Sequence, residues 1–133
     1  MAENDAILDY YRRVASATDP GRYRAHLMEL PDDIPTLCRI VQGLVIHDMW
    51  VTQYGIELVT DRLRELRLYY VERIIDRAFE LDDRPLDQPR SPDKRVILCC
   101  RDFSVLLCSI LRVKGIPARA RCGFGEASDS SPT

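Results

Sequence analysis

Apolar residues recur at helical spacing along most of the chain. This pattern predicts helices over residues 4–17, 34–47, 60–81 and 100–114. Residues 117–124 alternate instead, with small or apolar side chains on one side and arginines on the other, which predicts a strand with one buried face. The expected fold class is therefore α+β and predominantly helical.

Capping and turn residues divide these elements. Asn4 or Asp5 can cap the first helix, Asp33 can cap the second, and Gly115 is a natural stop for the last. Residues 82–94 carry three prolines among charged residues, so we expect an exposed connection there.

The layout separates a helical region, residues 1–94, from a segment of different character, residues 95–125, and a tail, residues 126–133. The tail is small, polar and acidic, and it holds too few apolar side chains to order itself, so we expect it to be disordered. Arginines between residues 62 and 77 alternate with acids, which predicts a solvated, ion-paired helix face.

Composition narrows the class of protein. The 133 residues include 19 basic and 21 acidic side chains, and 46% are hydrophobic, as in a single domain that can bury a core. A net charge of −2 argues against a nucleic-acid binder, which needs a basic surface. No apolar run approaches the roughly 18 residues of a membrane span, and residues 1–9 lack the basic start of a secretory signal. We expect a cytoplasmic protein that engages neither nucleic acid nor membrane.

The cysteines offer the candidate chemistry. An odd number of them without a secretory signal indicates reduced thiols rather than a disulfide framework. They are Cys38, Cys99, Cys100, Cys108 and Cys122. Two of them are adjacent, which suits a zinc site poorly, and no metal or cofactor is expected. A thiol redox role for the adjacent pair is disfavoured because neighbouring cysteines form strained disulfides.

Cys100 is the candidate nucleophile. It falls in the first turn of a predicted buried helix, where free backbone N–H groups and the helix dipole favour the thiolate. The structural alternative is that it packs as a small buried hydrophobe, as free cysteines often do. We expect His47 to have a structural or capping role at the end of its helix. Trp50 and Tyr54 either line a cleft or, as aromatic residues after a helix usually do, pack in the core.

A resemblance to a known family supports the first interpretation. Residues 100–125 begin Cys-Arg-Asp-Phe and contain Gly-Ile-Pro-Ala-Arg at positions 115–119. This segment, about a fifth of the 133 residues, resembles the core motif of the transglutaminase-like superfamily. Residues 41–47 and 81–86 resemble the helical lead-in of its bacterial members.

The resemblance implies a papain-like α+β core with a Cys-His-Asp triad in which Cys100 is the nucleophile. It implies acyl transfer through a thioester, from a glutamine side chain or a peptide-like amide of a protein substrate, to an amine or to water. In that family the catalytic histidine and aspartate lie on later strands, and this chain has no matching positions. We therefore expect a truncated chain without activity of its own.

The alternative is a non-catalytic helical interaction module or an oligomerising fragment. Without later strands to cover it, the predicted strand 117–124 leaves an unpaired edge and an open apolar face. This predicts a homodimer formed through that strand.

Overall fold

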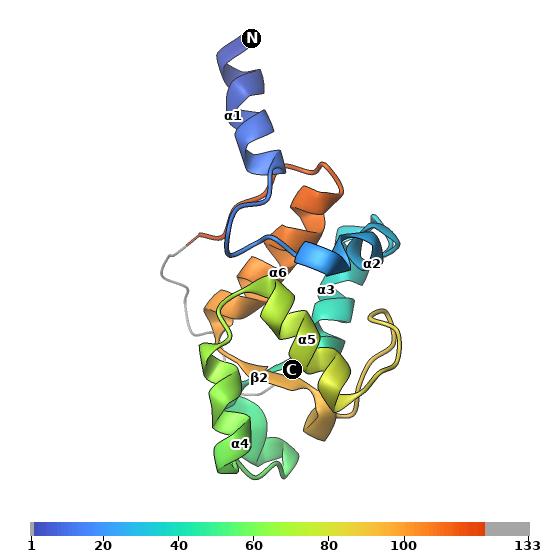
Figure 1. Cartoon of the computed structure of the whole chain (residues 1–133), viewed down its shortest axis with the longest axis vertical. Coiled ribbons are helices and arrows are strands. Elements are labelled where there is room, and N and C mark those ends of the chain that lie inside the picture. The colour runs from blue at the N-terminus through green and yellow to red at the C-terminus, as the bar shows by residue number, and fades with distance from the viewer. Residues whose placement is uncertain (1, 122–133) are drawn as a thin grey trace.

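A computed structural model of the chain describes residues 2–121 (Figure 1). The chain is mostly helical and contains a small two-stranded parallel sheet. The α-helices are α1 (Ala2–Arg12), α2 (Arg24–Met28), α3 (Ile34–Leu44), α4 (Thr60–Leu63), α5 (Val71–Leu81) and α6 (Cys100–Val113). The 3-10 helices are η1 (Gly21–Tyr23), η2 (Asp48–Tyr54), η3 (Arg64–Arg67) and η4 (Pro92–Lys94), and the strands are β1 (Val45–His47) and β2 (Val96–Leu98).

The sheet pairs two segments that are far apart in the sequence. β1 and β2 are parallel, and His47 at the end of β1 is the register partner of Leu98 at the end of β2. Parallel strands need a long crossover, and the η2 to η4 segment supplies it. Because the strands run the same way, the residues that follow them emerge at one edge of the sheet. That edge carries His47 and the start of α6.

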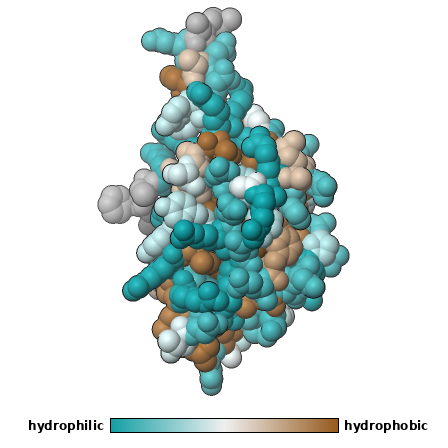
Figure 2. Space-filling view, in the orientation of Figure 1, coloured by the Kyte–Doolittle hydropathy of each residue, from teal (hydrophilic) through white to brown (hydrophobic). Residues whose placement is uncertain are grey.

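The core surrounds α6, which contacts α1, α2, α3 and α5. Its largest cluster of buried apolar side chains takes residues from both sides of position 94, for example Leu37 and Ile74 from one side and Leu106 and Ile110 from the other. A smaller cluster lies on the opposite face of the sheet and consists of Ile46, Val51, Ile56 and Ile97. Figure 1 shows α1 projecting from the body of the molecule, and Figure 2 shows a mostly hydrophilic surface with separate hydrophobic patches.

The first helix differs from its prediction. The pattern predicts residues 4–17, but α1 starts before Asn4 and Asp5, so neither caps it, and it stops five residues earlier than expected. Beyond its end, the buried Thr18 hydroxyl accepts a hydrogen bond from the backbone N–H of Ala15 at 2.8 Å and donates to its carbonyl oxygen. This hydrogen-bonded turn prevents residues 15–18 from continuing the helix.

The second predicted helix, 34–47, is correct in its first eleven residues only. Asp33 caps it as predicted, and its carboxylate accepts the Thr36 backbone N–H at 3.0 Å. The prediction is wrong for residues 45–47, which form β1. Val45 and Ile46 are β-branched and point to opposite faces of the sheet, and both are buried because apolar layers cover both faces.

The predicted helix 60–81 is broken. α4 ends at Leu63, η3 continues from it to Arg67, and α5 begins at Val71. Between them Tyr69 has a φ of 60°, in the left-handed region that a helix excludes. Val71 then donates its backbone N–H to Ala17, which ties the start of α5 to the segment after α1. A continuous apolar stripe therefore belongs to two helices with different directions.

The end of the described chain confirms one prediction and contradicts another. α6 ends at Val113, and Gly115, with a φ of 78°, terminates it while Ile116 donates its N–H to Leu111. The predicted strand 117–124 is wrong for residues 117–121, which form no strand. The Ala118 N–H donates to Tyr11 instead, so this stretch is fixed to α1 rather than to a sheet. Residues 122–124 and the predicted tail 126–133 lie outside the described residues.

Candidate functional site

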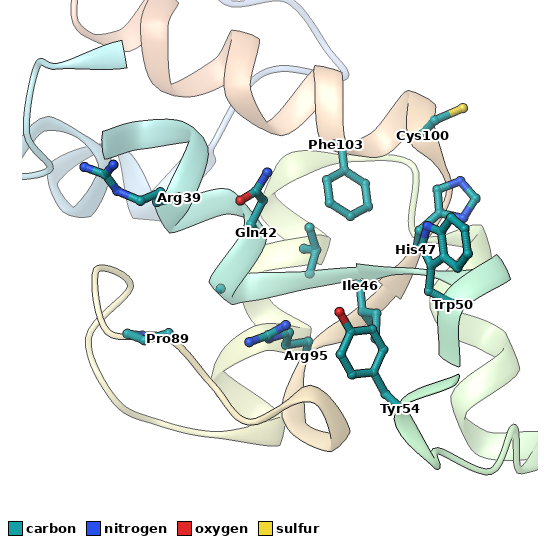
Figure 3. A pocket seen from close by; sticks show the side chains of 12 residues that line it. Arg39, Gln42, Ile46, His47, Trp50, Tyr54, Pro89, Arg95, Cys100 and Phe103 are labelled. Atoms are coloured by element: carbon teal, nitrogen blue, oxygen red, sulfur yellow. The ribbon is translucent and has the colours of Figure 1, made fainter. Parts of the chain in front are cut away.

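Cys100 is the first residue of α6 and follows β2 after a single residue. β2 is completely buried, so it fixes where the helix starts. The Cys100 side chain is exposed, and Figure 3 shows its sulfur directed away from the ring of Phe103. The Cys100 thiol therefore lies at a helix N-terminus, as predicted, and it is accessible to reagents.

The other described cysteines are less accessible. Cys108 is buried, as expected for core packing, and its burial raises the pKa of its thiol. Cys38 and Cys99 are half-buried, whereas Cys122 lies outside the described residues. Among the thiols of residues 2–121, Cys100 alone is exposed.

A pocket of about 620 Å³ opens beside Cys100. Its walls come from α3, β1, η2, the loop before β2 and the start of α6 (Figure 3). The polar side chains that line it are Arg39, Gln42, His47, Tyr54, Arg95 and Cys100. Ile46, Trp50 and Phe103 form apolar parts of the wall. Of the two possibilities left open for Trp50 and Tyr54, the structure supports the cleft.

His47 is brought to this pocket by the sheet. Its ring stacks on Phe103, with ring centroids 6.3 Å apart. Its Nδ1 atom lies 3.1 Å from the Met49 backbone N–H and 2.9 Å from Asp48 Oδ1. These contacts belong to different protonation states, because a bare Nδ1 accepts from Met49 and a protonated Nδ1 donates to Asp48. No hydrogen bond joins His47 to Cys100 within the part of the chain that the structure describes.

A buried carboxylate underlies the first turn of α6. Asp102 is 1% exposed and accepts a hydrogen bond from the Cys99 thiol at 3.2 Å. Its other oxygen accepts from Arg101 at 2.9 Å. A negative charge in the first turn stabilises a helix, and these contacts fix the backbone on which Cys100 is carried.

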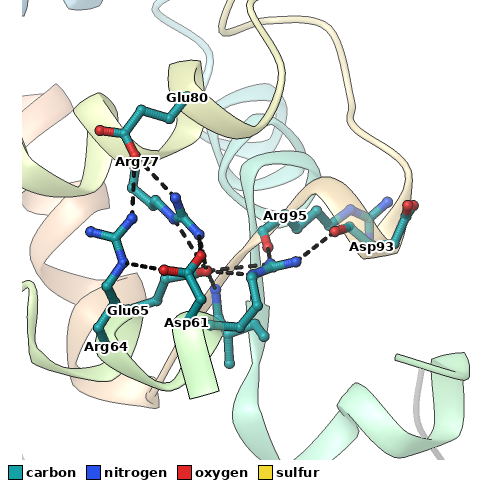
Figure 4. Close-up of polar contacts among 9 residues, drawn as sticks. Asp61, Arg64, Glu65, Arg77, Glu80, Asp93 and Arg95 are labelled. Carbon is teal, nitrogen blue, oxygen red and sulfur yellow. Dashed lines mark hydrogen bonds and ion pairs between the residues drawn. The ribbon is translucent and has the colours of Figure 1, made fainter. Parts of the chain in front are cut away.

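Arg95 is held in the pocket wall by its backbone and by its side chain. Its Nε donates to the Arg90 carbonyl oxygen at 2.9 Å, and its own carbonyl oxygen accepts from Arg62 at 2.6 Å. Arg62 in turn pairs with Glu65, a fully buried carboxylate that also accepts the Ile97 N–H at 2.8 Å (Figure 4). This network joins η3, β2 and the pocket wall.

The sequence pattern predicts Cys100 at the start of a helix, but it does not predict the pocket beside it. Arg39, Gln42 and Arg95 carried no signal, because the residues of the wall are scattered between positions 39 and 103 and only the crossover brings them together. His47 was expected to be structural because it was placed on a helix rather than at the end of a strand.

Within residues 2–121, no group of three or more His, Cys, Asp or Glu side chains is arranged to hold a metal ion. No helix among these residues has the length and apolar character that crossing a membrane requires.

Comparisons with protein-family models, curated proteins and solved structures found no match to this chain.

Proposed function

We propose that Cys100 is the nucleophile of a transglutaminase-like acyl-transfer site that acts on glutamine side chains or peptide-like amides. The observation that carries this proposal is that the exposed thiol of Cys100, at the N-terminus of α6, lines the pocket. Helix N-termini favour thiolates, and the thiolate is the reactive form. The resemblance of residues 100–125 to the transglutaminase-like core motif points to the same chemistry.

The proposed reaction has two steps. The Cys100 thiolate attacks the carbonyl carbon of an amide, the C–N bond breaks, and the amine leaves with a proton as the thioester forms. An amine or water then attacks the thioester carbonyl, which releases the acyl group and returns the proton to the thiol.

His47 is the proposed proton acceptor for the first step. The chain has two histidines, and the other, His26, packs against Tyr23 and Phe79 away from the pocket. A proton on Nδ1 of His47, donated to Asp48, leaves Nε2 bare and able to take the thiol proton. Catalytic hydrogen bonds often tighten only when substrate is bound, so the outward direction of the sulfur is compatible with this role.

Acylation by an activated ester tests the nucleophile directly. 4-Nitrophenyl acetate needs no proton donor for its leaving group, so its reaction reports the thiol alone. We expect a burst of one nitrophenolate per chain and one acetyl group on Cys100, located by peptide mass mapping. The Cys100→Ser variant loses the burst, whereas Cys99→Ser, a matched change at the neighbouring half-buried thiol, keeps it. Equal acetylation of Cys38 and Cys100 would rule the proposal out.

One observation favours the alternative, an interaction module. α1 projects from the body (Figure 1), and its side chains Ile7 and Tyr10 are 54% and 62% exposed. Apolar side chains on a projecting helix are typical of a surface that a partner covers. If this is the main function, Ile7→Asp changes the sedimentation coefficient at high protein concentration, and Cys100→Ser does not.

A further inference from the structure

Among residues 2–121, the charged side chains that line the pocket beside Cys100 are basic. Arg39 and Arg95 belong to its wall, and no aspartate or glutamate of the described chain does. The chain as a whole has more acidic than basic residues, so this lining departs from the average composition. Asp48, the nearby acid, lies outside the lining and contacts His47.

Neither arginine forms an ion pair with a carboxylate among residues 2–121, although Asp33 is near enough to Arg39 for the positive charge to contribute, after the hydrogen bonds from Thr36, to the lowered pKa of the Asp33 carboxyl group. All the ion pairs found in that range involve other residues. Arg39 donates one terminal N–H to the Thr36 hydroxyl, and Arg95 uses its Nε on the Arg90 carbonyl. The terminal nitrogens of Arg95 have no protein acceptor in the described chain.

Arg95 is also oriented. It is half-buried, and the Arg90 carbonyl fixes the direction of its guanidinium group. Arg95 and Tyr54 both line the pocket, and Figure 3 shows the guanidinium of Arg95 and the hydroxyl of Tyr54 below the β1 ribbon, with Gln42 above it. A rigid guanidinium fork binds a planar carboxylate, whose two oxygens accept parallel hydrogen bonds.

We propose that this pocket selects acyl donors that carry a carboxylate, with Arg95 as the main contact and Arg39 as a second positive charge. The carboxylate occupies the Arg95 and Tyr54 end of the pocket and presents an amide toward Cys100. The description of the ligand as an acyl donor rests on the proposed function, whereas the charge preference rests on the arginines.

The fluorescence of Trp50 gives a readout that does not depend on the thiol. It is the chain's single tryptophan and lines the pocket. The protein is titrated with N-acetylglutamine and with N-acetylglutaminamide, which share the side-chain amide and differ in the main-chain carboxylate. We expect the carboxylate form to bind at least roughly fivefold more tightly at low salt, and this preference to shrink in about 0.5 M salt.

Single substitutions identify the source of the preference. Arg95→Gln and Arg39→Gln each bring the affinity ratio toward one, and the exposed Arg39 provides the second variant if Arg95→Gln does not fold. Arg24→Gln, which removes the same charge from an exposed position on α2 outside the pocket, leaves the ratio unchanged. Equal binding of both probes, no binding of either, or an equal effect of Arg24→Gln would overturn the inference.

Two further measurements distinguish a carboxylate site from a general oxyanion site, and the inference from the proposed function. If inorganic phosphate binds more tightly than N-acetylglutamine through Arg95, the site takes oxyanions in general and the proposed substrate class is wrong. Cys100→Ser is expected to keep the preference. If it does while the acylation of Cys100 fails in the wild-type chain, the inference stands and the proposed function falls.

Discussion

The imidazole of His47 stacks on the ring of Phe103, with planes inclined by 28°. His47 ends β1, and Phe103 lies in the first turn of α6, so the contact joins two segments that are distant in the sequence. Cys100 and Phe103 are three residues apart on α6 and therefore share one helix face. The strand pairing of His47 with Leu98 thus places an imidazole and a thiol on one pocket.

Replacing His47 tests whether this arrangement is functional. We expect His47→Gln to slow the acetylation of Cys100 by 4-nitrophenyl acetate at pH 7 by roughly a hundredfold, the usual size of a general-base contribution. At high pH the two rates converge, because hydroxide then supplies the thiolate without a general base. Stopped-flow absorbance across pH 6–10 measures this.

The matched control is His26→Gln. His26 packs against Tyr23 and Phe79, outside the pocket, and its replacement leaves the pH profile unchanged. If His47→Gln follows the wild-type profile as well, the histidine only packs on Phe103 and takes no part in proton transfer.

The buried carboxylate of Glu65 is expected to be essential for stability. It is 0% exposed, pairs with Arg62 and Arg77, and accepts the Ile97 N–H of β2. Glu65→Ala leaves two poorly exposed guanidinium groups without their shared partner, and loss of one member of a buried ion pair costs about 3–5 kcal/mol. Urea denaturation followed by circular dichroism gives the loss directly.

Glu80 provides the comparison, because it contacts the same Arg77 at 3.0 Å but its side chain is 57% exposed. Glu80→Ala is expected to cost less than about 1 kcal/mol, as exposed pairs do. Similar losses from Glu65→Ala and Glu80→Ala would show that the burial of Glu65 has no energetic consequence.

The sequence was sufficient where local rules act alone. Asp33 caps α3 and Gly115 ends α6 because capping depends on a few neighbouring residues. The hydrophobic periodicity gave the wrong secondary structure where tertiary contacts determine it. Residues 45–47 form a strand because β2 is available to pair with them, and nothing within the segment itself reveals that partner.

The buried charges escaped prediction for the same reason. Arg62 and Arg77 were expected on a solvated helix face, yet their side chains are only 12% and 10% exposed and surround Glu65. Alternating charges look alike whether they face water or one another. At the candidate site, the local pattern predicted Cys100 at a helix N-terminus, whereas Arg95 lines the pocket because of the fold of the crossover.

The connection at residues 82–94, predicted to be exposed, is organised around one buried cation. Arg90 is 1% exposed and donates to the carbonyl oxygens of Asp82, Arg84, Pro85 and Gln88. Burial lowers the pKa of its guanidinium group. Four backbone acceptors thus depend on a single side chain.

Arg90→Ala is expected to cost about 2–4 kcal/mol, since it leaves these carbonyls without donors. Arg90→Lys recovers only part of this, because an ammonium group lacks the planar fork. Amide hydrogen exchange over residues 82–90 locates the effect. Arg84→Ala, at an arginine whose side chain is 45% exposed, is expected to leave the exchange of this loop nearly unchanged. Slow exchange in Arg90→Ala would mean that the loop holds its shape without the arginine.

Asp33 is expected to make the stability of α3 depend on pH. The Thr36 side chain and backbone N–H both donate to its carboxylate, and these bonds lower the pKa of Asp33 below its usual value. Because the folded pKa lies below the unfolded value of roughly 3.9, the ionised cap stabilises the protein above that pH. The contribution is lost as the pH falls through the folded pKa.

Asp33→Asn separates the charge from the hydrogen bonds, since asparagine also accepts at an N-cap but does not titrate. We expect Asp33→Asn to be less stable than wild type at pH 7 and the difference to close as the pH falls below about 4 in thermal denaturation. Asp33→Ala lacks the cap at every pH, so it stays below Asp33→Asn throughout. A constant difference between wild type and Asp33→Asn across this range would show that ionisation of Asp33 makes no contribution to folding.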